Sequence, residues 1–190
     1  MRSATQHCQT PSGFLGHPRE AADMAVQAVA LAEQRGTPIN LTVIGGGPGE
    51  DEMKELAAAK CPGRVHFCGP VHDHAALASI FASAAVTVVP DYGGLSIPHS
   101  LIHGVPVVAN DDPPANGPDY EYLYPETNGS VFPRGDVEAF TDQVLRWAYD
   151  EAMSPERKQA IEDRAREDAS PVLGAQRIFA AIDECLTRKD

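Results

Sequence analysis

Two adjacent glycines stand where a β-branched strand-like run passes into a helix, and this junction is the part of the sequence best suited to bind a ligand. Gly93-Gly94 precedes a helix expected over residues 96–103. Glycine lets the backbone approach a ligand closely and adopt positive φ. The free N–H groups at a helix start attract phosphate, so the amides of Gly94, Leu95 and Ser96 are expected to face an anion. The open alternative is that these glycines only make a tight turn.

A second glycine cluster follows another apolar run. Gly45-Gly46-Gly47 comes directly after the strand expected over residues 39–44. The cluster does not match the G-x-G-x-x-G fingerprint of dinucleotide-binding folds, and the chain contains no G-x-x-x-x-G-K-[ST] loop. The sequence therefore favours neither a dinucleotide cofactor nor a P-loop, and no cofactor is predicted.

Histidines and cysteines are the residues most able to hold a metal. His99 and His103 are four apart on one expected helix, and His72 and His74 flank Asp73, but neither pair has an evident third ligand. The four cysteines form no C-x-x-C pair and no zinc spacing. No metal site is predicted, and the cysteines are expected to be free thiols.

Strands and helices alternate along the first two thirds of the chain. This pattern is typical of βαβ units whose parallel sheet is covered on both faces. It predicts one three-layer, Rossmann-like α/β domain over residues 1–190 with a mostly parallel sheet of five or six strands. The expected strands are 39–44, 64–68, 86–89, 105–109 and 129–132, and the expected helices are 18–35, 49–60, 75–84, 96–103, 136–149, 155–168 and 171–187.

The remaining segments are expected to be less regular. Residues 1–12 are predicted to be a loose lead-in, and residues 13–16 the stump of a strand. Residues 111–128 are rich in Pro, Asp and Tyr and are predicted to be mostly loop. Residues 150–190 are predicted to form C-terminal helices with acidic, solvated surfaces.

Composition narrows the class of protein. The 190 residues are 43% hydrophobic and 22% charged, as in an ordinary globular protein, and the net charge is −12. An excess of negative charge argues against binding nucleic acid or an anionic membrane surface. No apolar run is long enough for a membrane span, and the first residues do not form a signal peptide. A cytoplasmic location is predicted.

Four segments, in order, resemble the nucleotide-sugar-binding half of GT-B fold glycosyltransferases of the group 1, or family-four, class. Val43-Ile-Gly-Gly-Gly-Pro48 is similar to that family's strand and G-x-G-P turn, and Arg64-Val-His-Phe-Cys-Gly-Pro-Val71 to its V-x-F-x-G-x-V strand. Residues 77–90 resemble its L-x-x-x-(Y/F)-x-x-A-D-V-x-V-x-P segment, with Ala85 where Asp is usual. Residues 91–109 resemble its E-x7-E region followed by G-x-P-V-(V/I)-A.

The last segment is the most specific. Pro90-Asp-Tyr-Gly-Gly-Leu-Ser-Ile-Pro-His99 is similar to the P-G-x-V-G-L-S-x-I-H of a polysaccharide-building branch, and Gly117-Pro-Asp-Tyr-Glu121 to its G-P-E-F-E. Asp91 stands at the first Glu of E-x7-E, and His99 at the second. The resemblance implies that His99 contacts the ribose of a nucleotide sugar, and an imidazole can donate or accept such a hydrogen bond.

The resemblance also implies roles for the other residues. Arg19 and Asp91 are implied to be catalytic residues of a retaining glycosyl transfer to an unknown acceptor, and Val71 lines the pocket of the base. The implied donor-binding residues are Gly45, Gly46, Gly47, Val71, Gly93, Gly94, Leu95, Ser96 and His99.

Two departures from the family bear on catalysis. The family carries an Arg and then a Lys that neutralise the leaving diphosphate, whereas Arg19 is the only cation expected there. The acceptor-binding domain that precedes the donor half in the family is absent from these 190 residues. The chain is therefore expected to need a protein partner or a missing N-terminal half, or to self-associate through its open cleft face.

Two alternatives remain. One is a nucleotide-binding or interaction module that has lost catalysis. The other is a relative of the nucleotide-sugar 2-epimerases, whose D-S-G-G-x-x-E-E motif Asp91-Tyr-Gly-Gly94 fits at its start. That second alternative is disfavoured because Ile97-Pro98 occupies the two Glu positions.

Overall fold

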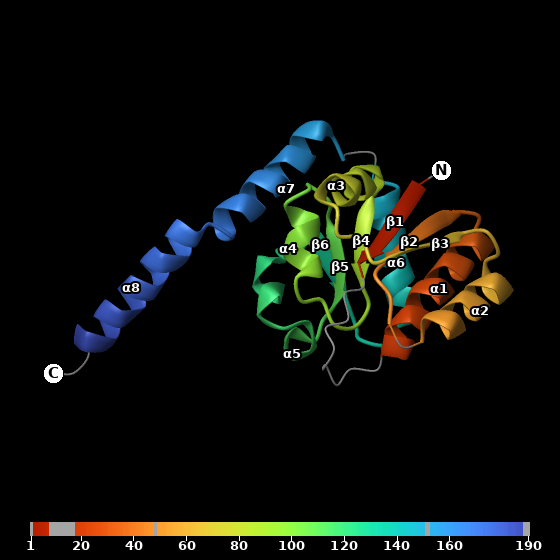
Figure 1. Cartoon of the computed structure of the whole chain (residues 1–190), viewed down its shortest axis with the longest axis horizontal. Coiled ribbons are helices and arrows are strands. Elements are labelled where there is room, and N and C mark those ends of the chain that lie inside the picture. Colours follow the sequence, from red (N-terminus) through yellow and green to blue (C-terminus); the bar gives the residue numbers. More distant parts are fainter. Residues whose placement is uncertain (1, 8–17, 48, 151–152, 188–190) are drawn as a thin grey trace.

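A six-stranded parallel sheet forms the centre of the fold (Figure 1). The structure is a computed structural model that describes residues 2–7, 18–47, 49–150 and 153–187. All five strand pairings are parallel, which confirms the predicted α/β class and the sheet of five or six strands. In the order β3-β2-β1-β4-β5-β6, the strands are β1 (Arg2–His7), β2 (Ile39–Ile44), β3 (Val65–Gly69), β4 (Val86–Val89), β5 (Val107–Asn110) and β6 (Gly129–Phe132).

Helices cover both faces of the sheet. One face packs against α1 (Pro18–Gln34), α2 (Glu50–Lys60) and α6 (Val137–Ala148) in the largest apolar cluster. The other face packs against α3 (His74–Ser83) and α4 (Ser96–Leu101), with α7 (Pro155–Asp168) against α4. The expected loop over residues 111–128 contains a short α5 (Pro113–Asn116) and a 3-10 helix η1 (Pro118–Tyr122).

Helix α6 shows how the sequence builds these layers. Its side-chain cap is Asp136, whose carboxylate accepts the amide of Ala139 at 2.9 Å. Phe140, Val144 and Trp147 recur at spacings of four and three residues, so they lie on one helix face and are buried against the sheet. The Trp147 indole N–H donates to the Ser130 hydroxyl on β6 at 3.0 Å, which satisfies a buried polar group.

The prediction for the first residues is wrong. Residues 2–7, expected within a loose lead-in, form β1, which pairs with both β2 and β4 in the middle of the sheet. The segment Arg2-Ser-Ala-Thr-Gln-His7 lacks the apolar run that marks a strand covered on both faces. Its place comes instead from backbone hydrogen bonds to two neighbours. The strand stump expected at residues 13–16 lies outside the described residues.

The C-terminal helices are confirmed, and α8 (Pro171–Thr187) extends away from the body of the molecule (Figure 1). Four of its large apolar side chains are exposed: Val172, Ile178, Phe179 and Ile182. Among the described helices, none combines the length and the apolar character needed to span a membrane.

Gly129 at the start of β6 offers a test of the sheet packing. A Cβ at this position would overlap the backbone carbonyl oxygen of Val107 and lie 2.5 Å from Leu123 Cδ1. A strand backbone can move only at a large cost in free energy. We therefore expect Gly129→Ala to lower the free energy of unfolding by roughly 3 kcal/mol, as measured by urea denaturation. Gly174 is the control, since a Cβ there meets no atom within 4 Å. Gly174→Ala should leave stability unchanged or slightly higher, and equal stability of the two variants would contradict the close strand approach.

Candidate functional site

Three turns that carry predicted site residues lie at the carboxyl edge of the sheet. Gly45–Gly47 follows β2, Val71 lies two residues after β3, and residues 91–96 follow β4. Because the strands are parallel, these turns share one edge. The strand order reverses between β1 and β4, which is where ligands bind in sheets of this kind.

The local structure favours glycine at both positions of the turn after β4, with or without a ligand. Gly94 has φ +45°, a left-handed value that costs other residues energy. A Cβ on Gly93 would lie 2.7 Å from Ile97 Cδ1 and 3.1 Å from Val89 Cγ1, both in buried side chains. The turn itself therefore favours glycine at position 93 for space and at position 94 for backbone conformation, as the tight-turn alternative expects.

Most of the amides expected to face an anion already have partners. The Gly94 amide donates to the Asn116 carbonyl at 3.2 Å, and the Ser96 amide donates to the Gly93 carbonyl at 3.0 Å. Within the described part of the chain, the Leu95 amide makes no hydrogen bond. The prediction that three amides are available is therefore corrected to one, at Leu95.

His99 lies in the short helix that follows this turn. Its amide donates to the Leu95 carbonyl at 3.0 Å, and Pro98 lies in the first turn of α4, where a missing N–H costs little. Burial lowers the pKa of the His99 imidazole, the charge of His74 lowers it further, and Asp119 opposes both. A neutral imidazole results at neutral pH, with one nitrogen that donates and one that accepts a hydrogen bond.

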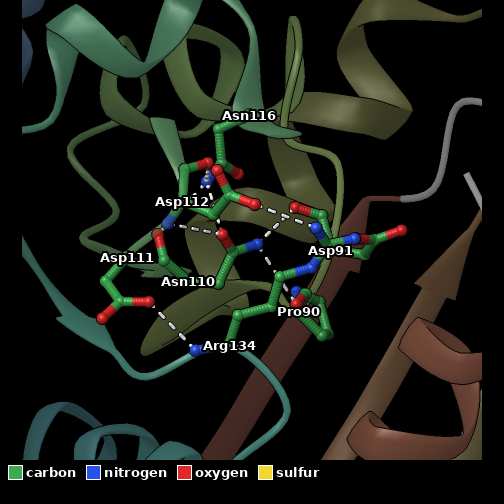
Figure 2. A network of polar contacts seen from close by, with 7 residues as sticks. All are labelled: Pro90, Asp91, Asn110, Asp111, Asp112, Asn116 and Arg134. Atoms are coloured by element: carbon green, nitrogen blue, oxygen red, sulfur yellow. Dashed lines mark hydrogen bonds and ion pairs between the residues drawn. The ribbon is translucent and has the colours of Figure 1, made fainter. Parts of the chain in front are cut away.

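A buried asparagine joins the ends of β4 and β5 (Figure 2). The Asn110 side-chain amide donates to the Asp91 carbonyl at 2.5 Å and to the Pro90 carbonyl at 3.3 Å. Its Oδ1 accepts the Asp112 amide at 3.0 Å and the side-chain amide of Asn116 at 3.0 Å. Asn110 and Asn116 are both fully buried. The backbone at Asp91 is thus fixed by a side chain from the neighbouring strand.

An arginine from the next strand along completes this network. Arg134, just after β6, pairs its Nη2 with Asp91 Oδ1 at 2.5 Å and its Nη1 with Asp112 Oδ2 at 2.9 Å (Figure 2). Its backbone amide donates to Asp111 Oδ1 at 3.0 Å. The nearby charge of Asp91 is the main cause that raises the pKa of the guanidinium. Arg134 is thus a cation at this edge of the sheet beside Asp91, and the sequence analysis does not place it there.

Asn110 and Arg134 were not among the predicted site residues. One signal was present, because an asparagine at the end of the otherwise apolar run 107–110 is a buried polar group that must find hydrogen bonds. The pairing of Arg134 with Asp91 had no local signal, since the two residues are 43 positions apart.

The other predicted residues lie along the same edge. Gly45 has φ +106°, and its amide donates to the Gly69 carbonyl at 2.8 Å, which ties the turn after β2 to the end of β3. Val71 is partly buried. Arg19 is the second residue of α1, and its side chain lies outside the described residues.

His103 and Cys61 take part in packing. The His103 ring stacks on Phe81, with ring centroids 5.0 Å apart. Cys61 is a free, buried thiol whose pKa is raised by burial, and Cys68 is also free. Among the residues that the structure describes, no three His, Cys, Asp or Glu side chains are placed to hold a metal.

A pocket of about 270 Å³ lies apart from the predicted residues. It is lined by Pro118, Asp119, Glu121, Tyr122, Tyr124 and Asp168. The Asp168 carboxylate accepts from the Tyr124 hydroxyl at 3.0 Å and pairs with Arg164 at 2.9 Å. No predicted site residue lines this pocket, so the carboxyl edge is the better candidate.

The sheet order and the carboxyl-edge turns define a Rossmann-like domain of the GT-B type, and solved glycosyltransferases share this fold. The G117R mutant of S. aureus TarM in complex with fondaparinux, alpha-GlcNAc-glycerol and UDP matches with a TM-score of 0.73 at 16% identity, over 89% of this chain and 33% of that structure's chain. Anabaena HepE in complex with UDP matches with a TM-score of 0.70 at 17% identity, over 95% of this chain and 48% of HepE.

The chain belongs to the group 1 glycosyl transferases, whose family model matches residues 12–150. It is similar to the D-rhamnosyltransferase WbpZ of Pseudomonas aeruginosa, with 29% identity over 133 residues, 67% of this chain and 34% of WbpZ. The chain thus spans about a third of the length of this curated relative.

Gly94 allows a direct test of the turn. We expect Gly94→Val to lower the free energy of unfolding by roughly 1–3 kcal/mol, because a β-branched residue is strained at positive φ. Gly94→Asn should cost less, since Asn tolerates the left-handed region. In both variants the added Cβ atom would lie 2.8 Å from the Tyr92 ring, which is exposed enough to move. This contact is the same in both, so the difference in stability reports the cost of the backbone conformation. Urea denaturation measures both, and equal losses would contradict the role of φ.

His99 in α4 and His103 just after it predict a pH dependence of stability. Burial lowers the pKa values of His99 and His103 in the folded chain. The unfolded chain then binds more protons below the ordinary histidine pKa of about 6.5, so stability falls as the pH drops through that value. We expect a lower free energy of unfolding at pH 5.5 than at pH 7, and a smaller difference in His103→Gln. An equal difference in wild type and variant would show that His103 is not involved.

Proposed function

We propose that this chain is the donor-binding half of a retaining glycosyltransferase and binds a nucleotide diphosphate sugar at the carboxyl edge of β1, β2 and β4. One observation carries the proposal: Asp91, the glycine turn and His99 follow each other directly after β4, beside the point where the strand order reverses. In this family such a segment meets the donor. The UDP bound in solved structures of similar fold supports the same ligand class.

The proposed ligand runs along the turn from phosphate to sugar. Gly93 and Gly94 let the backbone approach the diphosphate, which the Leu95 amide, just before α4, receives. The turn Gly45–Gly47 flanks it from β2. With one available amide and carboxylates around Arg134, the phosphate-binding charge is small, and modest affinity is expected.

The remaining groups of the donor meet the ends of the site. His99 holds the ribose through its neutral imidazole, and Val71 lines the pocket of the base. Asp91 contacts the transferred sugar, and Arg19 stabilises the charge that develops on the leaving diphosphate.

Catalysis also requires an acceptor site. The longer relatives contain a region that this chain does not match, and we assign the acceptor site to an equivalent of that region. This chain spans between a third and a half of the solved structures that it matches. The open face beside the donor site would meet that part, a protein partner or a second copy of this chain.

The engaged amides of Gly94 and Ser96 favour one second candidate, a nucleotide-binding module without catalysis. Such a module would bind a nucleoside diphosphate and its sugar conjugate equally well, because no residue would be arranged to hold the sugar. A transferase half would bind the conjugate more tightly.

Isothermal titration with UDP, GDP and ADP tests the proposed function. At least one should bind wild type, and His99→Ala should weaken it by about 1–2 kcal/mol, or 5- to 30-fold, the scale of one lost hydrogen bond to a buried partner. His66, an exposed histidine on β3, gives the control His66→Ala, which should bind as wild type does. No binding to wild type below about millimolar, or equal binding by both variants, would refute the assignment.

A further inference from the structure

Resting on the proposed function, we propose that Arg134 is a positioning residue that holds the Asp91 carboxylate in place to receive hydroxyl groups of the donor sugar. Arg134 reaches Asp91 from the end of β6, two strands away in the sheet. The segment after β6 therefore contributes a residue to the proposed sugar site, although it is not part of the glycine turn.

The guanidinium is held at two points. Its Nη2 pairs with Asp91 Oδ1 at 2.5 Å, and its Nη1 pairs with Asp112 Oδ2 at 2.9 Å (Figure 2). The backbone amide of Arg134 donates to Asp111 Oδ1 at 3.0 Å, so its main chain is fixed to the end of β5 as well. A planar group with two carboxylate partners has a defined orientation, which a single surface ion pair lacks.

Asp91 is also held from its backbone side. The buried Asn110 amide donates to the Asp91 carbonyl at 2.5 Å, and Asn110 itself is tied to Asn116. The side chain of Asp91 is 14% exposed, so both its main chain and one carboxylate oxygen are fixed in a largely buried place. Within the described residues, Oδ2 of Asp91 makes no hydrogen bond and can accept from a ligand.

An exposed ion pair between long side chains contributes little to stability unless its geometry is ideal. Arg146 and Glu126 form an exposed pair with two hydrogen bonds, with side chains 49% and 63% exposed, and neither residue belongs to the proposed donor site. Arg134 differs because its partner is mostly buried and belongs to the proposed donor site, while its own side chain is 48% exposed. The edge therefore presents the carboxylate of Asp91, held in place by Arg134, as an acceptor for a hydroxyl group of the donor sugar.

The test separates binding of the sugar from binding of the nucleotide. Wild type, Arg134→Met and Arg134→Lys are titrated with UDP and UDP-glucose, and with GDP and GDP-mannose. We expect wild type to bind one sugar conjugate at least fivefold more tightly than its nucleoside diphosphate. Arg134→Met should bind the diphosphate within twofold of wild type and lose that preference. Arg134→Lys should restore part of it, because an ammonium can pair with one carboxylate.

Two controls make the result specific. Arg146→Met removes the exposed pair with Glu126, which lies outside the proposed site, and should keep the preference of wild type. The double variant Asp91→Asn with Arg134→Met should lose no more than Asp91→Asn alone, since the arginine acts through the aspartate.

Amide hydrogen exchange gives a readout that needs no ligand. Without nucleotide, Arg134→Met should speed exchange at residues 91–94 at least fivefold and leave the amides of α6 unchanged. If nucleotides bind and Arg134→Met keeps the sugar preference, the positioning role is wrong while the proposed function stands. If no nucleotide binds wild type, the proposed function is wrong, and unchanged exchange at residues 91–94 would refute the positioning role separately.

Discussion

Backbone pairing of β1 with strands on both of its sides holds the sheet together. β1 pairs with β2 over the whole span from Arg2↔Ile39 to His7↔Ile44, and with β4 at Ala4↔Val86 and Thr5↔Thr87. In the strand order, β3 and β2 reach β4, β5 and β6 only through β1. The glycine turns after β2 and β4 flank this strand. Because β1 lies between β2 and β4, the distance between their two glycine turns is set by the hydrogen-bonded spacing of β1 from each neighbour. A ligand that touches both turns has to span that distance.

A second level of order lies at the edge itself, where buried amides link successive turns. Asn110 fixes the backbone after β4, and Asn116, bonded to Asn110, accepts the Gly94 amide through its own carbonyl. Opening one of these hydrogen bonds leaves a buried polar group unpaired, which costs roughly 1–3 kcal/mol. The glycine turn owes its shape to this linked set as well as to its own φ values.

The sequence predicted the elements whose signal is local. Residues 39–44 and 86–89 carry the apolar, β-branched runs of strands covered on both faces, and both form strands with these bounds. β1 could not be found this way, because the segment Arg2-Ser-Ala-Thr-Gln-His7 has no apolar run. For the site, the glycines located the turn, but the contact of Gly93 with Ile97 and the pairing of Asp91 with Arg134 depend on distant packing. Family resemblance assigned roles to Asp91 and His99 that local patterns alone do not.

The link between Asp91 and Arg134 also sets an order of events when the chain is made. The glycine turn and its aspartate leave the ribosome 43 residues before the arginine that pairs with them. Until β6 has joined the sheet beside β5, Asp91 and Asp112 lack their shared cation, and Asp111 lacks the backbone amide of Arg134. Repulsion among these carboxylates would keep the edge loose during this interval. Docking of β6 then adds the last strand and the neutralising charge in one step, so the sheet and the charged network at its carboxyl edge are completed together.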